Sequence, residues 1–134
     1  YTGRIREVNA ELAEKLLGEG YMLVVSPIAL GLEYELLNVD ADQAAARIAE
    51  ALKAETLLIL TDVEGVMVDG KILEEVKVGE VEGLKPRIGV GMNRKLIMCA
   101  EAVKGGVREA MISSGLIENP LSALEEDLGT RIRP

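Results

Sequence analysis

Short apolar segments rich in β-forming residues alternate along this chain with segments whose apolar residues recur at helical spacing. Residues 21–26, 56–61 and 107–113 are the expected strands, and helical spacing appears in residues 8–17 and 40–52. Strands that are apolar along their whole length are covered on both faces, as in parallel sheets packed between helices. The alternation therefore predicts an α/β fold, a three-layer sandwich around a mainly parallel sheet.

The remaining elements are shorter and are marked by turn residues. Asp69-Gly70 between residues 66–68 and 71–73 predicts a hairpin with a type I′ turn. A helix of about 12 residues should follow a glycine loop that ends at Met92 and should stop at Gly105-Gly106. We further expect a loop at residues 28–37, short helices at 79–84 and 120–126, and a terminal strand at 130–132.

Composition limits the classes of function open to the chain. Its 134 residues predict one compact domain over residues 1–134, or one lobe of a larger protein. The absence of histidine excludes Ser-His-Asp and Cys-His hydrolases and every histidine-containing metal site. A net charge of −8, with three Tyr and no Phe or Trp, argues against nucleic acid as a partner.

Targeting signals are not evident either. The longest apolar stretch, residues 21–32, is broken by Pro27 and is shorter than the roughly 20 residues of a membrane span. No signal peptide precedes it, and a single cysteine fits a reducing compartment, so we expect a cytoplasmic protein without a membrane anchor. Cys99 lies within an expected helix and is interpreted as a core residue rather than a nucleophile.

Polar residues stand in front of the helix at 41–52. The segment from Asn38 to Asp42 lacks the glycine and the glutamate of a calcium loop, so calcium is rejected. Asp40 and Gln43 form a candidate capping box, and Asp42 suits the positive end of the helix. The functional alternative makes Asn38 a ligand donor and Asp42 an organiser of nearby lysines.

Two further segments carry candidate phosphate contacts. Gly89 and Gly91 precede a helix with Lys95 expected in its first turn, where free N–H groups and the helix dipole attract phosphate. Glycine and lysine at a helix start are common, so this signal is weak by itself. Thr61, Asp62 and the glycine at position 65 follow a strand and are equally compatible with an ordinary turn.

Taken in order, residues 37–45, 60–66, 91–95 and 129–132 resemble the carboxyl-terminal half of the amino acid kinase family. The closest similarity is to the acetylglutamate kinase branch. Within that branch, residues 1–4, 25–29 and 91–96 look most like the kinases that phosphorylate aminoadipate or glutamate held on an amino-group carrier protein. The resemblance implies a carbamate kinase-like fold, of which this chain would be the carboxyl-terminal, ATP-binding lobe.

The resemblance also implies an activity, the ATP-dependent phosphorylation of a side-chain carboxylate to an acyl phosphate in lysine or arginine biosynthesis. ATP and Mg2+ would be the cofactors, without dedicated protein ligands for the metal. Asn38 would hold the substrate, Asp42 would orient phosphate-binding lysines, and Lys95 would stabilise the transferred phosphoryl group. The residues around the nucleotide would be Thr61, Asp62, Gly65, Gly89, Gly91, Met92 and Asn93.

Kinases of this family are longer than this chain by an amino-terminal, acceptor-binding lobe. We therefore expect the chain by itself to bind nucleotide with negligible turnover, and to work with that lobe in a homo-oligomer. Arg4 and Arg6 are candidates for contact with an acidic carrier protein, although a solvated surface beside Glu7 is the simpler interpretation. A non-catalytic nucleotide-binding or interaction module remains the alternative, as does a kinase of carbamate, UMP or aspartate.

Overall fold

A four-stranded sheet organises the computed structural model, which describes residues 2–126 and 128–134. Its strands lie in the order β3 (Thr56–Thr61), β7 (Glu109–Ser114), β8 (Thr130–Arg133) and β6 (Glu75–Lys77). The pairs β3–β7 and β6–β8 are parallel, and β7–β8 is antiparallel. The expected α/β fold with a mainly parallel sheet is therefore confirmed.

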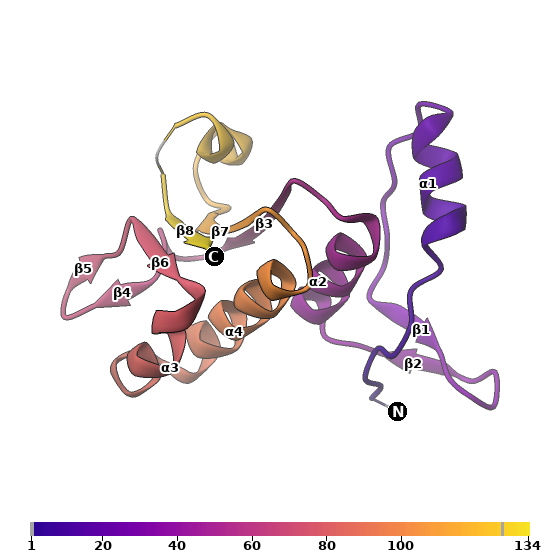
Figure 1. Cartoon of the computed structure of the whole chain (residues 1–134), viewed down its shortest axis with the longest axis horizontal. Coiled ribbons are helices and arrows are strands. Elements are labelled where there is room, and N and C mark those ends of the chain that lie inside the picture. The colour runs from indigo at the N-terminus through magenta and orange to yellow at the C-terminus, as the bar shows by residue number, and fades with distance from the viewer. Residues whose placement is uncertain (1, 127) are drawn as a thin grey trace.

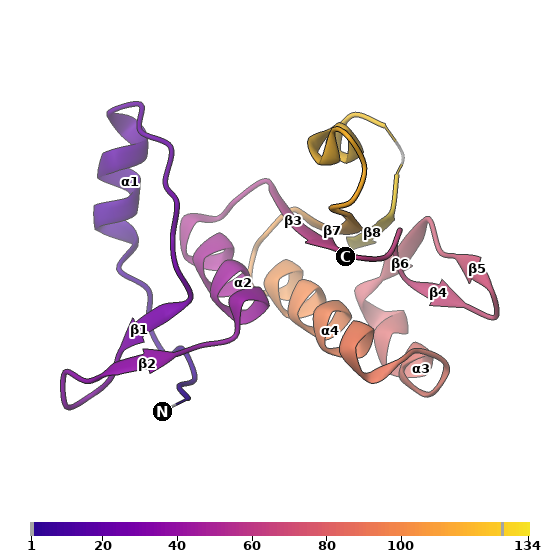
Figure 2. The same cartoon turned by 180° about the vertical axis from the view of Figure 1, so that it is seen from behind.

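Two helices, α2 (Ala41–Leu52) and α4 (Val90–Lys104), cover one face of this sheet (Figure 1). The core lies between them and the sheet, and its buried side chains include Ile59, Leu96 and Ile112. On the other face the described residues place the short 3-10 helix η3 (Pro120–Leu124), which contacts β7 (Figure 2). This second layer is thinner than a full sandwich layer, and η3 ends before the expected limit at residue 126.

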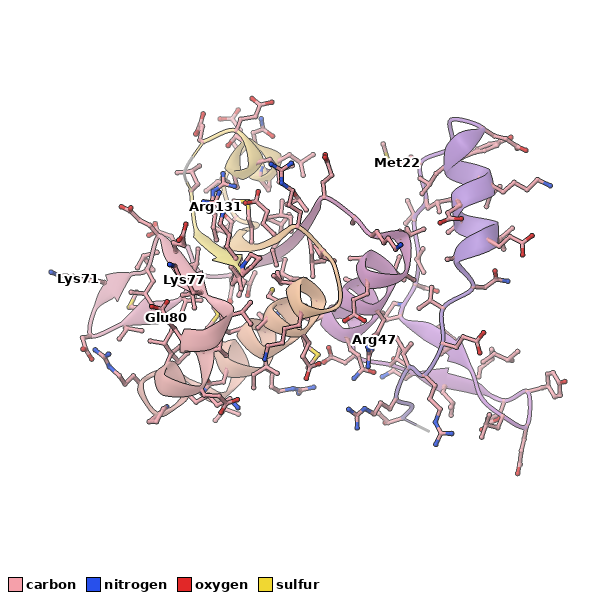
Figure 3. The ribbon with its side chains drawn as sticks, viewed as in Figure 1. Met22, Arg47, Lys71, Lys77, Glu80 and Arg131 are labelled. Carbon is pink, nitrogen blue, oxygen red and sulfur yellow. The ribbon has the colours of Figure 1, made fainter. Side chains whose placement is uncertain are left out.

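The expected hairpin is present and has the expected turn. Strands β4 (Met67–Val68) and β5 (Lys71–Ile72) pair antiparallel around Asp69 and Gly70, whose φ angles are 51° and 79°. Two positive φ angles in a two-residue loop define the type I′ turn. Lys71 stands at the outer end of this hairpin (Figure 3).

Between the hairpin and α4 the chain is more ordered than the sequence indicates. Strand β6, which no sequence pattern predicted, leads into η1 (Val78–Glu80), α3 (Val81–Leu84) and η2 (Lys85–Arg87). The Lys77 N–H donates to a Glu80 carboxylate oxygen at 2.9 Å, and Figure 3 shows these two residues together at the start of η1. The expected helix at 79–84 is thus confirmed. The expected glycine loop is shorter, because α4 begins at Val90.

The expected strand at residues 21–26 is wrong. In the described part of the chain this segment has no strand partner, and Met22 and Val24 are 90% and 94% exposed. An apolar sequence gains stability as a strand only where a neighbour accepts its hydrogen bonds and covers its side chains. Here the segment runs extended between α1 (Ala10–Gly18) and β1 (Ile28–Leu30).

A second hairpin replaces the loop expected at residues 28–37. Strand β1 pairs antiparallel with β2 (Leu36–Asn38), and the turn between them places Tyr34 at a φ of 63°. Both cartoons place α1, β1 and β2 on the side of α2 that faces away from the sheet (Figures 1 and 2). None of the described helices combines the length and the apolar character required to cross a membrane.

Candidate functional site

The topology gathers the candidate residues at one edge of the sheet. Helix α2 leads into β3 and α4 leads into β7, and these two strands are parallel. Each helix runs back against the strand that follows it, so both helix N-termini lie where the strands end. In open α/β sheets this carboxyl edge is the usual position of ligand sites. Asp42, Thr61 and Lys95 belong to it, whereas Asn38 lies in the separate two-stranded sheet, two residues before the cap of α2.

Asp42 and Lys95 form the centre of the site. Lys95 Nζ lies 2.7 Å from Asp42 Oδ2, and each side chain is 25% exposed. Asp40 caps α2 by accepting from the Gln43 N–H at 3.0 Å, which places Asp42 in the first turn. Lys95 lies in the second turn of α4 rather than the first, because the helix starts at Val90. The structure thus joins two residues that are far apart in the sequence.

A second ion pair, which the sequence analysis did not predict, lies beside the first. Arg94 donates to Asp40 Oδ2 at 2.9 Å, so adjacent residues of α4 hold both acidic residues at the start of α2. In the sequence, the only indication of this role for Arg94 is its position next to Lys95. The expected capping box is half present, because the Gln43 side-chain oxygen accepts from the Ile5 N–H at 3.0 Å.

Asn38 ends β2, two residues before the cap of α2. Its carbonyl oxygen accepts from the Gly3 N–H at 2.9 Å, and its side chain is exposed. The next residue, Val39, is buried at 4% exposure and anchors this corner. The side chain of Asn38 is therefore accessible to a ligand.

The start of α4 is open to a ligand. Gly89 is its N-cap, and no side chain of the described residues caps it. A Cβ added at Gly89 or Gly91 would meet no atom within 4 Å, and neither residue has a positive φ. The fold therefore does not require glycine at these positions, whereas a group approaching the free N–H donors would benefit from the missing side chains.

Two residues that were expected around the nucleotide, Met92 and Asn93, make contacts within the protein. Met92 packs against the core. The Asn93 amide nitrogen donates to the carbonyls of Lys85 and Ile88, each at 2.9 Å, and so fastens η2 to the first turn of α4. Its Oδ1 is buried without a hydrogen-bond partner among the described residues. The side chain of Asn93 thus holds the segment from Gly89 to Gly91 in place rather than pointing outwards from it.

The residues after β3 divide into two groups. Thr61 Oγ1 donates to Asp62 Oδ1 at 3.1 Å at the exposed end of the strand. Gly65 is buried, and a Cβ there would lie 2.7 Å from Thr130 Oγ1. Packing against Thr130 is therefore sufficient to explain Gly65. A role for Thr61 and Asp62 at a nucleotide remains a prediction.

Thr130 is a buried residue whose hydroxyl joins two segments of this region, a role that the sequence analysis did not predict. Its hydroxyl accepts from the Val66 N–H at 2.8 Å and donates to the Leu73 carbonyl at 2.6 Å. It thereby links β8 to both ends of the hairpin segment. A threonine in a terminal strand carries no sequence signal for such a role.

A cavity of about 310 Å³ opens beside the ends of β3 and β7. Its walls include Ser113, Ser114 and Glu74. A larger groove of about 610 Å³ lies between α1 and α2, but its lining is apolar except for Asn9 and includes none of the candidate residues. The lining of the smaller cavity also includes none of the candidate residues, so neither cavity is assigned to the site.

Cys99 lies one turn after Lys95 and is fully buried. Burial, reinforced by the negative charge of Asp42, raises the pKa of the thiol from 9.0 to about 12. The neutral thiol is a poor nucleophile, so the interpretation of Cys99 as a core residue is confirmed.

Metal ligands are not grouped in the described part of the chain: no three acidic or cysteine residues there lie close enough to hold an ion. Asp40 and Asp42 are each occupied by a cation. These carboxylates therefore balance the positive charges of Arg94 and Lys95.

The fold, together with a comparison with family profiles, places the chain in a known class of proteins. It belongs to the amino acid kinase family, whose profile matches residues 1–114.

Particular relatives can then be named. A kinase of Sulfurisphaera tokodaii, named LysW-aminoadipate/LysW-glutamate kinase, is 47% identical over 98% of this chain and 51% of its own length. The enzyme of the same name from Sulfolobus acidocaldarius is 46% identical over 98% of this chain and 51% of its own. The chain thus spans about half the length of the curated relatives it matches.

Solved structures agree with this placement. N-acetylglutamate synthase from Neisseria gonorrhoeae, complexed with coenzyme A and N-acetyl-glutamate, superposes with a TM-score of 0.92 at 28% identity. The superposition covers 100% of this chain and 32% of that one. Carbamate kinase from Giardia lamblia bound to AMP-PNP gives a TM-score of 0.77 at 22% identity, over 96% of this chain and 50% of that one, and shows a shared fold.

Proposed function

We propose that residues 1–134 form the nucleotide-binding part of a kinase that transfers phosphate from ATP to a side-chain carboxylate. The carrying observation is the contact between Lys95 and Asp42 beside the open, glycine-lined start of α4. Free N–H donors and the helix dipole would attract a phosphate group here, next to the side chains of Arg94 and Lys95.

The chain's own residues would contribute position and charge. Asp42 holds Lys95 in one place, and Lys95 then stabilises negative charge on the transferred phosphoryl group. Gly89 and Gly91 let the phosphates approach the backbone, while Asn93 keeps that segment in place. A carboxylate acceptor is already a nucleophile, so the reaction needs no general base, in agreement with the lack of histidine.

Mg2+ would be held chiefly by the phosphates and would neutralise their charge. Thr61 and Asp62 at the end of β3 would border the nucleotide, and Asn38 would contact the acceptor. These assignments come from the resemblance, and the exposed positions of Asp62 and Asn38 support them.

For the acceptor we propose aminoadipate or glutamate on a carrier protein, with free acetylglutamate as the related candidate. The names of the relatives support the first choice. The reaction would belong to lysine or arginine biosynthesis in the cytoplasm. We further propose that these residues work with an amino-terminal, acceptor-binding lobe, in a homo-oligomer.

The test combines this chain with the amino-terminal half of the Sulfurisphaera tokodaii relative, ATP, Mg2+ and each acceptor, and detects acyl phosphate as hydroxamate. We expect product from the two halves together, near-background product with Lys95→Ala, and normal product with the control Lys104→Ala at the other end of α4. ATP binding without hydroxamate from any acceptor would instead support the non-catalytic module.

A further inference from the structure

Thr130 completes the base of the β4–β5 hairpin, which lies beside β6 in both cartoons (Figures 1 and 2). Beyond the last pair of this hairpin, the Leu73 N–H donates to the Val66 carbonyl at 2.9 Å. In a hydrogen-bonded antiparallel pair, the Val66 N–H would donate back to the Leu73 carbonyl. Here the Thr130 hydroxyl stands between those two groups, accepting at 2.8 Å and donating at 2.6 Å. A side chain of β8 thus replaces one hydrogen bond of the hairpin ladder.

The backbone on both sides of Thr130 holds this hydroxyl in place. Thr130 is fully buried and pairs with Ile112 of β7. Gly129, which has a φ of 93°, lies so close to β7 that an added Cβ would collide with the Ile112 carbonyl oxygen. On the other side, the Arg131 N–H donates to the Glu74 carbonyl at 2.9 Å. Thr130 therefore has a fixed position between β7 and the start of β6.

The turn that this hydroxyl holds carries two of the proposed nucleotide residues. Thr61 ends β3, Asp62 follows it, and three residues separate Asp62 from Val66. At the β3 end of the turn, the Thr61 carbonyl accepts from the Gly115 N–H at 2.7 Å. At the hairpin end, the Val66 N–H donates to Thr130. The turn is therefore anchored at both ends, and Thr130 supplies the second anchor.

We propose that Thr130 is a positioning residue for ATP binding, because its hydroxyl fixes the turn that carries Asp62. This inference rests on the proposed function and extends it to a fully buried residue. Without the hydroxyl, the Val66 N–H loses its partner and the turn rearranges to find another. ATP would then have to order the turn as it binds, which lowers its affinity.

The test is calorimetric titration of the 134-residue chain with ATP and Mg2+, at a temperature at which circular dichroism shows each variant to be folded. Thr130→Val removes the hydroxyl and keeps the size of the side chain, whereas Thr130→Ser keeps the hydroxyl. We expect Thr130→Val to weaken ATP binding about tenfold, because the released turn must be ordered again. Thr130→Ser should bind ATP as tightly as the unmodified chain.

Val107→Ala is the control for a loss of stability alone. Val107 is buried in the same core at 2% exposure, and it precedes β7 at the edge of the sheet opposite the site. This variant should also lower the urea midpoint of unfolding, because it leaves a cavity in the core. Its ATP affinity should stay unchanged.

Hydrogen exchange at the Val66 amide tests the same contact without a substitution. If an ordered turn favours ATP, then ATP must favour the ordered turn by thermodynamic linkage. We expect the Val66 amide to be protected in the unmodified chain and to exchange more slowly still when ATP is bound.

Several results would overturn the inference. They are equal ATP affinity in Thr130→Val and the unmodified chain, an equal loss of affinity in Thr130→Ser or Val107→Ala, and exchange at Val66 that bound ATP does not slow. Absence of ATP binding by the unmodified chain would contradict the proposed function itself, and this inference with it.

Discussion

At the scale of single residues, Cys99 is a sensitive reporter of the packing behind the site. Its thiol is buried one turn from Lys95, and its raised pKa of about 12 keeps it protonated in the folded chain. We expect negligible reaction with thiol reagents at pH 8 until the chain unfolds. Fast labelling of the native chain, at the rate of the urea-unfolded chain, would contradict this packing.

The same shift predicts how stability depends on pH. The unfolded thiol ionises near 9.0 and the folded thiol near 12, so the folded state binds its proton more tightly. The contribution of Cys99 is therefore complete below about pH 9 and is lost as the pH rises towards 12. Urea unfolding should show a steeper loss of stability above pH 9 than in Cys99→Ala.

Thr130 should be the most sensitive polar residue of the core. Thr130→Val leaves the Val66 N–H and the Leu73 carbonyl without their partner, at a cost of about 2 kcal/mol in the free energy of unfolding. Thr130→Ser keeps the hydroxyl and should cost only about 1 kcal/mol, from the lost methyl group. Chemical denaturation of the two variants checks the difference, and equal losses would show that the hydrogen bonds contribute little.

At the scale of elements, the start of α4 lets the proposed ligand role of Gly91 be compared with the packing role of Gly65 after β3. Gly91→Ala adds a Cβ that meets nothing, so stability should stay the same or rise by up to about 1 kcal/mol. ATP affinity should nevertheless fall several-fold, because the methyl group obstructs the backbone donors. Calorimetry and thermal unfolding measure both quantities.

Gly83→Ala in α3 is the matched control, since its added Cβ also meets nothing. It should leave ATP affinity unchanged. Gly65→Ala should behave in the opposite way to Gly91→Ala and lower stability, because its Cβ would collide with Thr130. Unchanged ATP affinity in Gly91→Ala would argue against phosphate at this helix start.

Elements with local signals could be predicted from the sequence. Helix α2 with its Asp40 cap, strand β3 and the Asp69-Gly70 turn all match their expected positions. Elements that form only because a segment distant in the sequence pairs with them could not be predicted in this way. Residues 21–26 have a strand-like sequence without a described partner, and β6 is a strand only because β8 pairs with it. The turn at Tyr34 was hidden because a non-glycine residue holds the positive φ.

The site shows the same division. Glycines before a helix and a lysine after them indicated the start of α4, and resemblance supplied Asp42. The contacts of Arg94 with Asp40 and of Asn93 with the preceding loop depend on how α2 and α4 pack. No spacing rule in one sequence contains that information, which is why the contact of Arg94 and the hydrogen bonds of Asn93 to the preceding loop were not predicted.

At the scale of the whole molecule, the described chain is well packed at the sheet and less so around α1. None of the residues of α1 is buried, whereas α4 buries five of its residues. The proposed phosphate site lies on the well-packed side, between α2 and α4. We therefore expect nucleotide binding to depend on the sheet together with α2 and α4, which is the part of the chain that has a hydrophobic core.

The most direct test of the central claim is calorimetric titration of the 134-residue chain with ATP and Mg2+. Our account predicts saturable binding that weakens at least tenfold in Lys95→Ala, is reduced in Asp62→Ala, and is unchanged in Lys104→Ala. Equal affinity in Lys95→Ala and the unmodified chain, or no binding at millimolar ATP, would contradict the assignment of this edge as the nucleotide site.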